Sequence, residues 1–179
     1  MAGHGLTGVL LVGGASRRFG SPKALAYLGG ETLAERAWRV LGEACDERMA
    51  VGKRWDALPL PFPVLDDGSD LRAPIAGVVA GLRAARTEVC VFLPVDCPLI
   101  SAAALRQLAN AAPARPPNGP LPGAYRRTAL PLLEQKLARG DYSLRNLDAS
   151  VSELDSRELA NVNTPDDLTS LSVARRRTS

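Results

Sequence analysis

The chain has 179 residues, of which 46% are hydrophobic and 23% charged, so it can bury one substantial core and is expected to form a single domain over residues 1–179. A formal net charge of +3 and an aromatic content of 4% argue against a nucleic-acid-binding surface, and no apolar run approaches the ~18 residues of a membrane span. A single histidine, and three cysteines without C-x-x-C spacing, argue against histidine-based catalysis and a structural zinc site. The first residues lack the charged start of a signal peptide, so we expect a cytoplasmic protein.

The first part of the chain predicts a strand, a loop, a helix and two short strands. Residues 7–12 form an apolar run that ends in glycines, which is typical of a strand buried on both faces in a parallel sheet. After the loop, Thr32 can cap a helix and Glu35 follows three residues later, as in a capping box. Short strands are expected at residues 48–51 and 63–65.

The rest of the chain continues the alternation of helices and strands. A proline in the first turn indicates a helix over residues 73–85, and residues 89–95 read as a second buried strand. Ser101 can cap the next helix, a further helix is expected at residues 127–138, and Thr164 can cap the last one. The predicted architecture is therefore α/β with a mostly parallel sheet, in which ligands bind beyond the carboxyl ends of the strands.

The loop after the first strand has the composition of a phosphate-binding loop. Its pattern is G-G-x-S-x-R-x-G-x-x-K, formed by Gly13, Gly14, Ser16, Arg18, Gly20 and Lys23. Glycines let backbone N–H groups converge on phosphate oxygens, and the cations Arg18 and Lys23 offset the charge of a polyphosphate. The loop is not a Walker A motif, because no Gly-Lys-Ser/Thr triplet is present. The alternative is a solvated turn with incidental charges.

Two further polar residues are candidates for a metal site. Asp96 follows the second buried strand, where a lone carboxylate can hold a hard cation such as Mg²⁺ or can form a turn. Asn163 directly precedes the last helix, where it can supply a neutral oxygen to the same metal or cap the helix. Cys97, beside Asp96, is expected to be a small packing residue.

Five segments of this chain, taken in order, carry a family resemblance that covers nearly its whole length. They read VLLVGGASRRFGSPKALAYLGG, VLDD with PIAGVVAGL, VFLPVDCPLIS, LPGAYRRTALPLLEQKLARGDYSLRNL and NVNTPDDL. Together they resemble the molybdenum cofactor guanylyltransferase (MobA) family of nucleotidyltransferases. The resemblance implies a three-layer α/β/α, Rossmann-like fold of the GT-A type that binds GTP and Mg²⁺.

The resemblance also implies a role for particular residues. Nucleotide-binding residues would be Leu11, Val12, Gly13, Gly14, Lys23, Asp67, Gly77 and Asp96. Arg18, Lys23 and Asp96 would be catalytic, with Asp96 and Asn163 at the metal. Tyr125 and Arg126 would lie where the family holds its pterin substrate.

The implied reaction is transfer of GMP from GTP to the phosphate of molybdopterin, with release of pyrophosphate. Transient partners that deliver or accept the cofactor are possible, and neither nucleic acid nor a membrane is expected as a partner. Ser-Pro-Lys at the end of the loop resembles the related cytidylyltransferases and sugar nucleotidyltransferases, so CTP with molybdopterin, or a sugar phosphate, is the alternative. A non-catalytic nucleotide-binding module is a second alternative, although a complete loop together with Asp96 argues against it.

Overall fold

The computed structural model describes residues 3–13 and 19–176, and its centre is a seven-stranded sheet. The strands are β1 (Gly3–Leu11), β4 (Glu47–Gly52), β5 (Val64–Asp66), β6 (Thr87–Pro94), β7 (Ala114–Arg115), β8 (Gly123–Arg126) and β9 (Ser150–Val151). Their order across the sheet is β5-β4-β1-β6-β8-β7-β9. Strands β5, β4, β1 and β6 run parallel to one another, β8 runs antiparallel to both β6 and β7, and β7 pairs in parallel with β9. The sheet is mostly parallel, as predicted.

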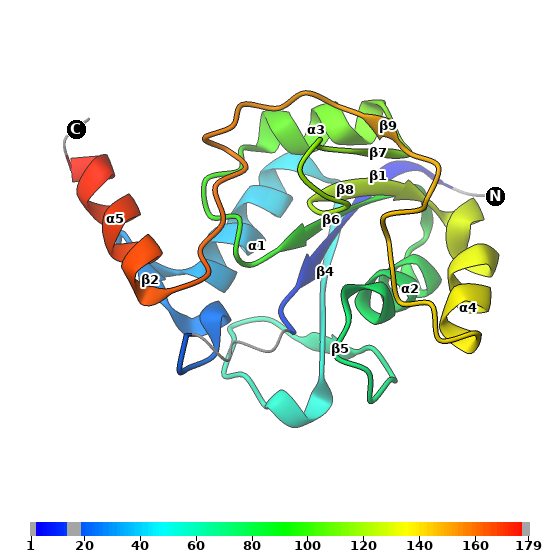
Figure 1. Cartoon of the computed structure of the whole chain (residues 1–179), viewed down its shortest axis with the longest axis horizontal. Coiled ribbons are helices and arrows are strands. Elements are labelled where there is room, and N and C mark those ends of the chain that lie inside the picture. The colour runs from blue at the N-terminus through cyan, green and yellow to red at the C-terminus, as the bar shows by residue number, and fades with distance from the viewer. Residues whose placement is uncertain (1–2, 14–18, 177–179) are drawn as a thin grey trace.

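Helices cover both faces of this sheet. They are α1 (Leu33–Ala44), α2 (Pro74–Ala84), α3 (Ala102–Asn110), α4 (Leu130–Ala138) and α5 (Pro165–Arg176). Helices α1 and α3 lie on one face, α2 and α4 lie on the other, and α5 stands apart beyond the edge of these layers (Figure 1). Three one-turn 3-10 helices, η1 (Lys23–Leu25), η2 (Arg54–Asp56) and η3 (Arg127–Ala129), complete the helical elements of the described chain. The three-layer α/β/α class is thereby confirmed.

The alternation of side chains along β1 divides the core into two halves. Leu10 and Val12 pack with α1 and α3, whereas Val9 and Leu11 pack with α2 and α4. All four side chains are buried, as the apolar run at residues 7–12 predicts. None of the described helices combines the length and the apolar character that crossing a membrane requires.

A small hairpin joins the phosphate-loop region to α1. It consists of β2 (Tyr27–Leu28) and β3 (Glu31–Thr32), which pair antiparallel. The hydroxyl of Thr32 accepts the backbone N–H of Glu35 at 3.1 Å, and the carboxylate of Glu35 accepts the N–H of Thr32 at 2.9 Å. The capping box predicted at the start of α1 is therefore present.

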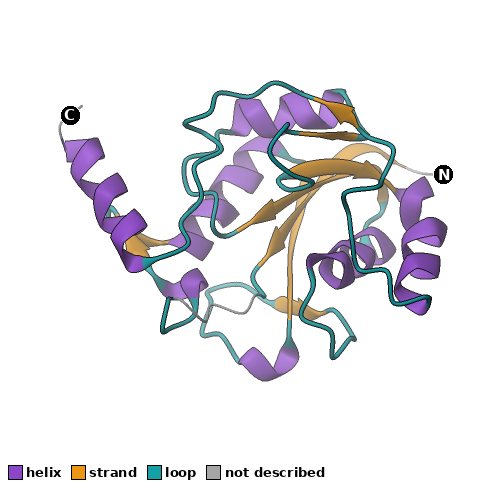
Figure 2. Ribbon diagram, in the orientation of Figure 1, coloured by secondary structure: helices purple, strands orange, loops and turns teal. Residues whose placement is uncertain are grey.

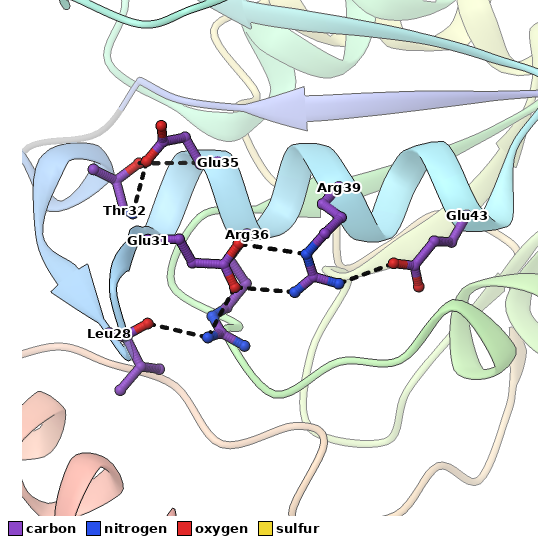
Figure 3. A network of polar contacts seen from close by, with 7 residues as sticks. All are labelled: Leu28, Glu31, Thr32, Glu35, Arg36, Arg39 and Glu43. Carbon is purple, nitrogen blue, oxygen red and sulfur yellow. Dashed lines mark hydrogen bonds and ion pairs between the residues drawn. The ribbon is translucent and has the colours of Figure 1, made fainter.

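A buried arginine fastens the hairpin to α1. Arg36 donates from Nη2 to the carbonyl of Leu28 at 3.0 Å and pairs with Glu31 at 2.9 Å. Figure 3 shows the Glu31 carboxylate between the guanidinium groups of Arg36 and Arg39. Since Lys23 is only four residues before β2, this network also anchors the end of the loop.

Several elements differ from the sequence expectations. The first strand begins at Gly3, well before residue 7, and the helix expected from residue 127 starts with the one-turn η3 before α4 begins at Leu130. Figure 2 shows the hairpin and the short strands β7 and β9, which were not anticipated. These strands have two residues each, too few to show a period in the sequence.

Candidate functional site

A cleft lies at the carboxyl ends of β1, β4 and β6, and two adjoining cavities form it. The loop cavity, of about 680 Å³, is lined on its outer side by residues 20–24 and by Asp56. The helix cavity, of about 280 Å³, is lined by residues 51–53 and by the start of α2. The residues common to both are Leu11, Gly13, Arg72, Pro94 and Asp96. The cleft is thus where the topology of a parallel sheet places a ligand.

Lys23 lies between the two candidate metal ligands. Its Nζ donates to Oδ1 of Asn163 at 3.2 Å and is 3.6 Å from Oδ2 of Asp96. Lys23 starts η1, Asp96 follows the end of β6, and Asn163 precedes α5, so three distant segments meet here. The side chains of Lys23 and Asp96 are 16% and 27% exposed, which leaves both accessible from the cleft.

Backbone contacts fix Asn163 in this position. The N–H of Val162 donates to the carbonyl of Asp96 at 2.8 Å. The hydroxyl of Thr164 accepts the N–H of Asp167, while the Asp167 carboxylate accepts the N–H groups of Asn163 and Thr164. These hydrogen bonds, that from Asn163 first, lower the pKa of Asp167. Thr164 therefore caps α5, as predicted, and the side chain of Asn163 contacts Lys23, which lines the loop cavity.

The side-chain oxygens of Asp96 and Asn163 are suitable ligands for a magnesium ion. Phosphate oxygens of the substrate would complete the coordination of that ion. Both oxygens face the same ammonium group, so the position already accommodates a cation. Among the described residues, no group of three or more His, Cys, Asp or Glu side chains could hold a metal ion. Mg²⁺ commonly takes one or two carboxylates together with the phosphates of a substrate, so this donor set fits it.

The helix cavity contains a buried ion pair that the sequence analysis missed. Lys53 donates from Nζ to Oδ1 of Asp67 at 2.7 Å and to the carbonyl of Ser69. The two side chains are only 4% and 6% exposed. Ser69 also donates its N–H to Asp67 Oδ1 at 3.0 Å, which closes the turn after β5. One sequence signal was available, because Lys53 is one of only three lysines in the chain and directly follows a strand.

Gly77 permits the close approach of α2 to β1. A Cβ at this position would lie 2.8 Å from Cδ2 of Leu11, which is too close without a shift of the leucine. Leu11 and Gly77 both line the helix cavity, and Val12 lines the loop cavity. Gly13 lines both. The structure therefore gathers these predicted nucleotide-binding residues on one cleft.

Cys97 lies beside Asp96, and its thiol is 3.8 Å from Oδ1 of that residue. Its thiol is buried and donates to Oδ1 of Asn161 at 3.2 Å. Burial, with the neighbouring Asp96 charge as a smaller cause, raises the pKa of the thiol well above its usual range. A neutral thiol in this position is a packing residue, as its sequence context indicates.

The structure does not bring Tyr125 and Arg126 to the cleft. Tyr125 is 1% exposed, packs against Phe92 and donates its hydroxyl to the carbonyl of Pro120 at 2.7 Å. Arg126 is paired in register with Val89, near the start of β6, and its guanidinium pairs with Glu88. The cleft lies at the other end of β6, so β8 carries these residues away from it.

The segment before β8 reaches the cleft instead, because Leu121 lines the helix cavity. Two other predicted residues, Gly14 and Arg18, lie outside the described residues. Their expected contacts with the nucleotide remain predictions.

Comparisons with known proteins identify the family of this chain. Residues 8–156 match the model of the MobA-like NTP transferase domain. A Chloroflexus aggregans protein named "Probable molybdenum cofactor guanylyltransferase" is 32% identical over 190 residues, covering 91% of each chain.

Solved structures share the fold. Molybdopterin-guanine dinucleotide biosynthesis protein A from Archaeoglobus fulgidus superimposes with a TM-score of 0.78 at 22% identity, covering 96% of this chain and 99% of that one. A Mycobacterium tuberculosis protein crystallised in complex with manganese superimposes with a TM-score of 0.60 at 21% identity, covering 93% and 97% of the two chains. With the family model matched over most of its length, this chain belongs to the MobA-like NTP transferases and is a nucleotidyltransferase.

Proposed function

We propose that this enzyme transfers GMP from GTP to the phosphate of molybdopterin and releases pyrophosphate. The observation that carries the proposal is the meeting of Lys23 with Asp96 and Asn163 beside the loop cavity, which Lys23 and Asp96 line. The guanylyltransferase name of a relative that is 32% identical and matches 91% of this chain supports the choice of substrates.

The proposed nucleotidyl transfer does not require a general base. The attacking phosphate oxygen is already an anion at neutral pH and pyrophosphate is a good leaving group, so the main difficulty is to bring two polyanions together. In our proposal Lys23 donates to the phosphate oxygens of GTP and neutralises charge on the departing pyrophosphate. Arg18 would add a second cation from the same loop.

Asp96, with Asn163, would hold Mg²⁺ against the phosphates. When bound, the ion supplies Lewis-acid stabilisation of the charge that develops on the phosphate oxygens. Lys23 occupies the space between these two oxygens in the structure, so we expect its ammonium to move toward the phosphates when the ion binds.

The base would occupy the helix cavity. Asp67 uses Oδ1 for Lys53 and Ser69, while Oδ2 makes no hydrogen bond to any described residue. A carboxylate oxygen of this kind can accept the N–H groups on the Watson–Crick edge of guanine. Gly77 lines the same cavity, where the absence of a side chain lets Leu11 pack closely against α2.

The proposal is tested by thermal denaturation with Mg²⁺ and each of GTP, CTP, UTP and ATP, followed by pyrophosphate release with molybdopterin as acceptor. A ligand at about a hundred times its dissociation constant adds ~2.7 kcal/mol to stability. For a chain of this size that corresponds to a rise in Tm of about 5–10 °C.

We expect the full rise and pyrophosphate release with GTP alone. A rise with CTP or UTP instead would contradict the guanylyltransferase and leave a nucleotidyltransferase with another product. Binding of GTP without pyrophosphate release in the presence of molybdopterin would favour a non-catalytic nucleotide-binding module.

A further inference from the structure

Arg72 lies at the junction of the two cavities, in the segment between β5 and α2. It lines both the loop cavity and the helix cavity. Its guanidinium donates from Nη2 to Oδ1 of Asp56 at 2.8 Å and from Nη1 to Oδ2 at 3.5 Å. It has no further hydrogen bond or ion pair with the described residues. Sequence reasoning did not single out either residue.

The partner of Arg72 also belongs to the cleft. Asp56 ends η2 and lines the loop cavity. Of the described residues that line this cavity, only Lys23 and Arg72 are cationic, and they come from two different segments: the loop after β1 and the segment before α2. A polyphosphate in the loop cavity would therefore pass within reach of both groups.

The ion pair between Asp56 and Arg72 is weak enough for a phosphate group to replace Asp56 as the partner of Arg72. The side chains are 19% and 41% exposed, so solvent screens their attraction and the pair contributes little to folding. A phosphate group offers the guanidinium the same two-pronged geometry as a carboxylate and carries more charge. By contrast, Lys53 in the helix cavity is buried and held by two acceptors, so it is fixed in place.

We propose that Arg72 binds the β- or γ-phosphate of the nucleoside triphosphate, and that it leaves Asp56 to do so. This inference rests on the proposed nucleotidyl transfer. It adds Arg72 to Lys23 as a second described cation that binds the polyphosphate. Asp56 is then a positioning residue, which holds the guanidinium at the mouth of the cavity until the nucleotide arrives.

The test compares Arg72→Ala with Asp56→Asn by calorimetric titration with Mg²⁺–GTP and, separately, with GMP. The loss of a hydrogen bond to a charged group corresponds to about a tenfold to hundredfold change in affinity. We expect Arg72→Ala to weaken GTP binding by about that factor, with GMP affinity unchanged, because GMP lacks the β- and γ-phosphates. Asp56→Asn should tighten GTP binding, because it removes the competing carboxylate.

Arg83→Ala is the matched control. Arg83 lies in the last turn of α2, is 61% exposed, pairs with Glu134 and lines neither cavity. The Arg83→Ala substitution removes the same charge as Arg72→Ala, and it should leave the affinities for GTP and GMP unchanged. Circular dichroism checks that each variant is folded, and Arg72→Lys, which keeps the charge without the two-pronged geometry, should bind GTP with intermediate affinity.

Opposite effects of the two variants support an exchange, whereas a merely structural pair would make them act in the same direction. Equal weakening by Arg72→Ala and Asp56→Asn, or no difference from Arg83→Ala, would overturn the inference. If the wild-type protein selects CTP, the guanylyltransferase proposal fails, and the same comparison with CTP and CMP still decides the role of Arg72. If it binds no nucleoside triphosphate, the inference fails as well.

Discussion

Lys23 shows how one side chain can connect segments that are far apart in sequence. Its ammonium faces Asp96 and Asn163, which lie 73 and 140 positions further along the chain. The sequence was sufficient to select these three residues, because each follows a strand or precedes a helix at the carboxyl edge of the sheet. It marked Lys53 only by the scarcity of lysine, because the burial of that side chain depends on Asp67, 14 residues further along the chain.

Substitution of Lys23 or Asp96 by alanine should lower turnover by about a hundredfold, since one preorganised electrostatic group contributes ~3 kcal/mol to a barrier. The measurement is the rate of pyrophosphate release by purified variants with matched melting temperatures. Lys136→Ala is the control, because Lys136 pairs with Asp141 at the end of α4, away from the cleft. Turnover near the wild-type rate in either cleft variant would remove that residue from the proposed mechanism.

Lys53→Met should destabilise the protein by about 3–5 kcal/mol, because it leaves the buried Asp67 carboxylate without its cation. Urea denaturation measures this loss. The double variant Lys53→Met/Asp67→Asn should recover part of the stability, since no unpaired charge then remains. Equal stability of the single and double variants would mean that solvent reaches Asp67 once the lysine is gone.

At the scale of elements, the local sequence specified the helices better than the strands. Caps at Thr32, Ser101 and Thr164 are all present, because a cap depends on residues three apart. The short strands β7 and β9 depend on partners far along the chain, and β8 reverses the direction that the alternation of strands and helices indicates. That reversal is the reason why Tyr125 and Arg126 lie away from the cleft.

The hairpin β2–β3 should depend on Arg36 and not on Arg39, although both pair with Glu31. Arg36→Met removes a buried guanidinium and leaves the carbonyl of Leu28 without this donor, so we expect a loss of about 2–3 kcal/mol. Arg39 is 49% exposed, so Arg39→Ala should cost at most about 1 kcal/mol.

Urea denaturation of the two variants at one pH makes this comparison. Equal losses would show that the network stabilises the hairpin through the exposed pair as much as through the buried one.

At the scale of the whole molecule, the two halves of the core bury ionisable groups on both faces of the sheet. Desolvation raises the pKa of Cys90 to about 11 and the pKa of Cys45 to about 12. It also raises the pKa of Tyr125 to about 12. Neutral forms of these side chains are therefore part of the folded state at physiological pH.

These raised pKa values predict a loss of stability in alkaline solution. An unfolded thiol ionises near pH ~8.5, whereas the folded Cys90 keeps its proton until pH about 11. Between these values the folded state binds more protons, so the free energy of unfolding falls as pH rises. Each such thiol should cost about 2 kcal/mol by pH ~10.

Urea denaturation between pH 7.5 and pH 10 measures the slope of the free energy of unfolding against pH. The slope should be smaller in Cys90→Ala, whatever that substitution does to the stability at neutral pH. An identical slope in the variant would show that Cys90 does not contribute.

The hydrogen bond from Val162 to Asp96 has a consequence for the order in which the protein is made. Residues enter the growing chain from the amino end, so strands β1 and β6, which precede Lys23 and Asp96, can pair before Asn163 has been translated. The third member of the cluster arrives only with the segment that leads into α5. A nascent chain can therefore have β1 and β6 paired and still lack a complete site.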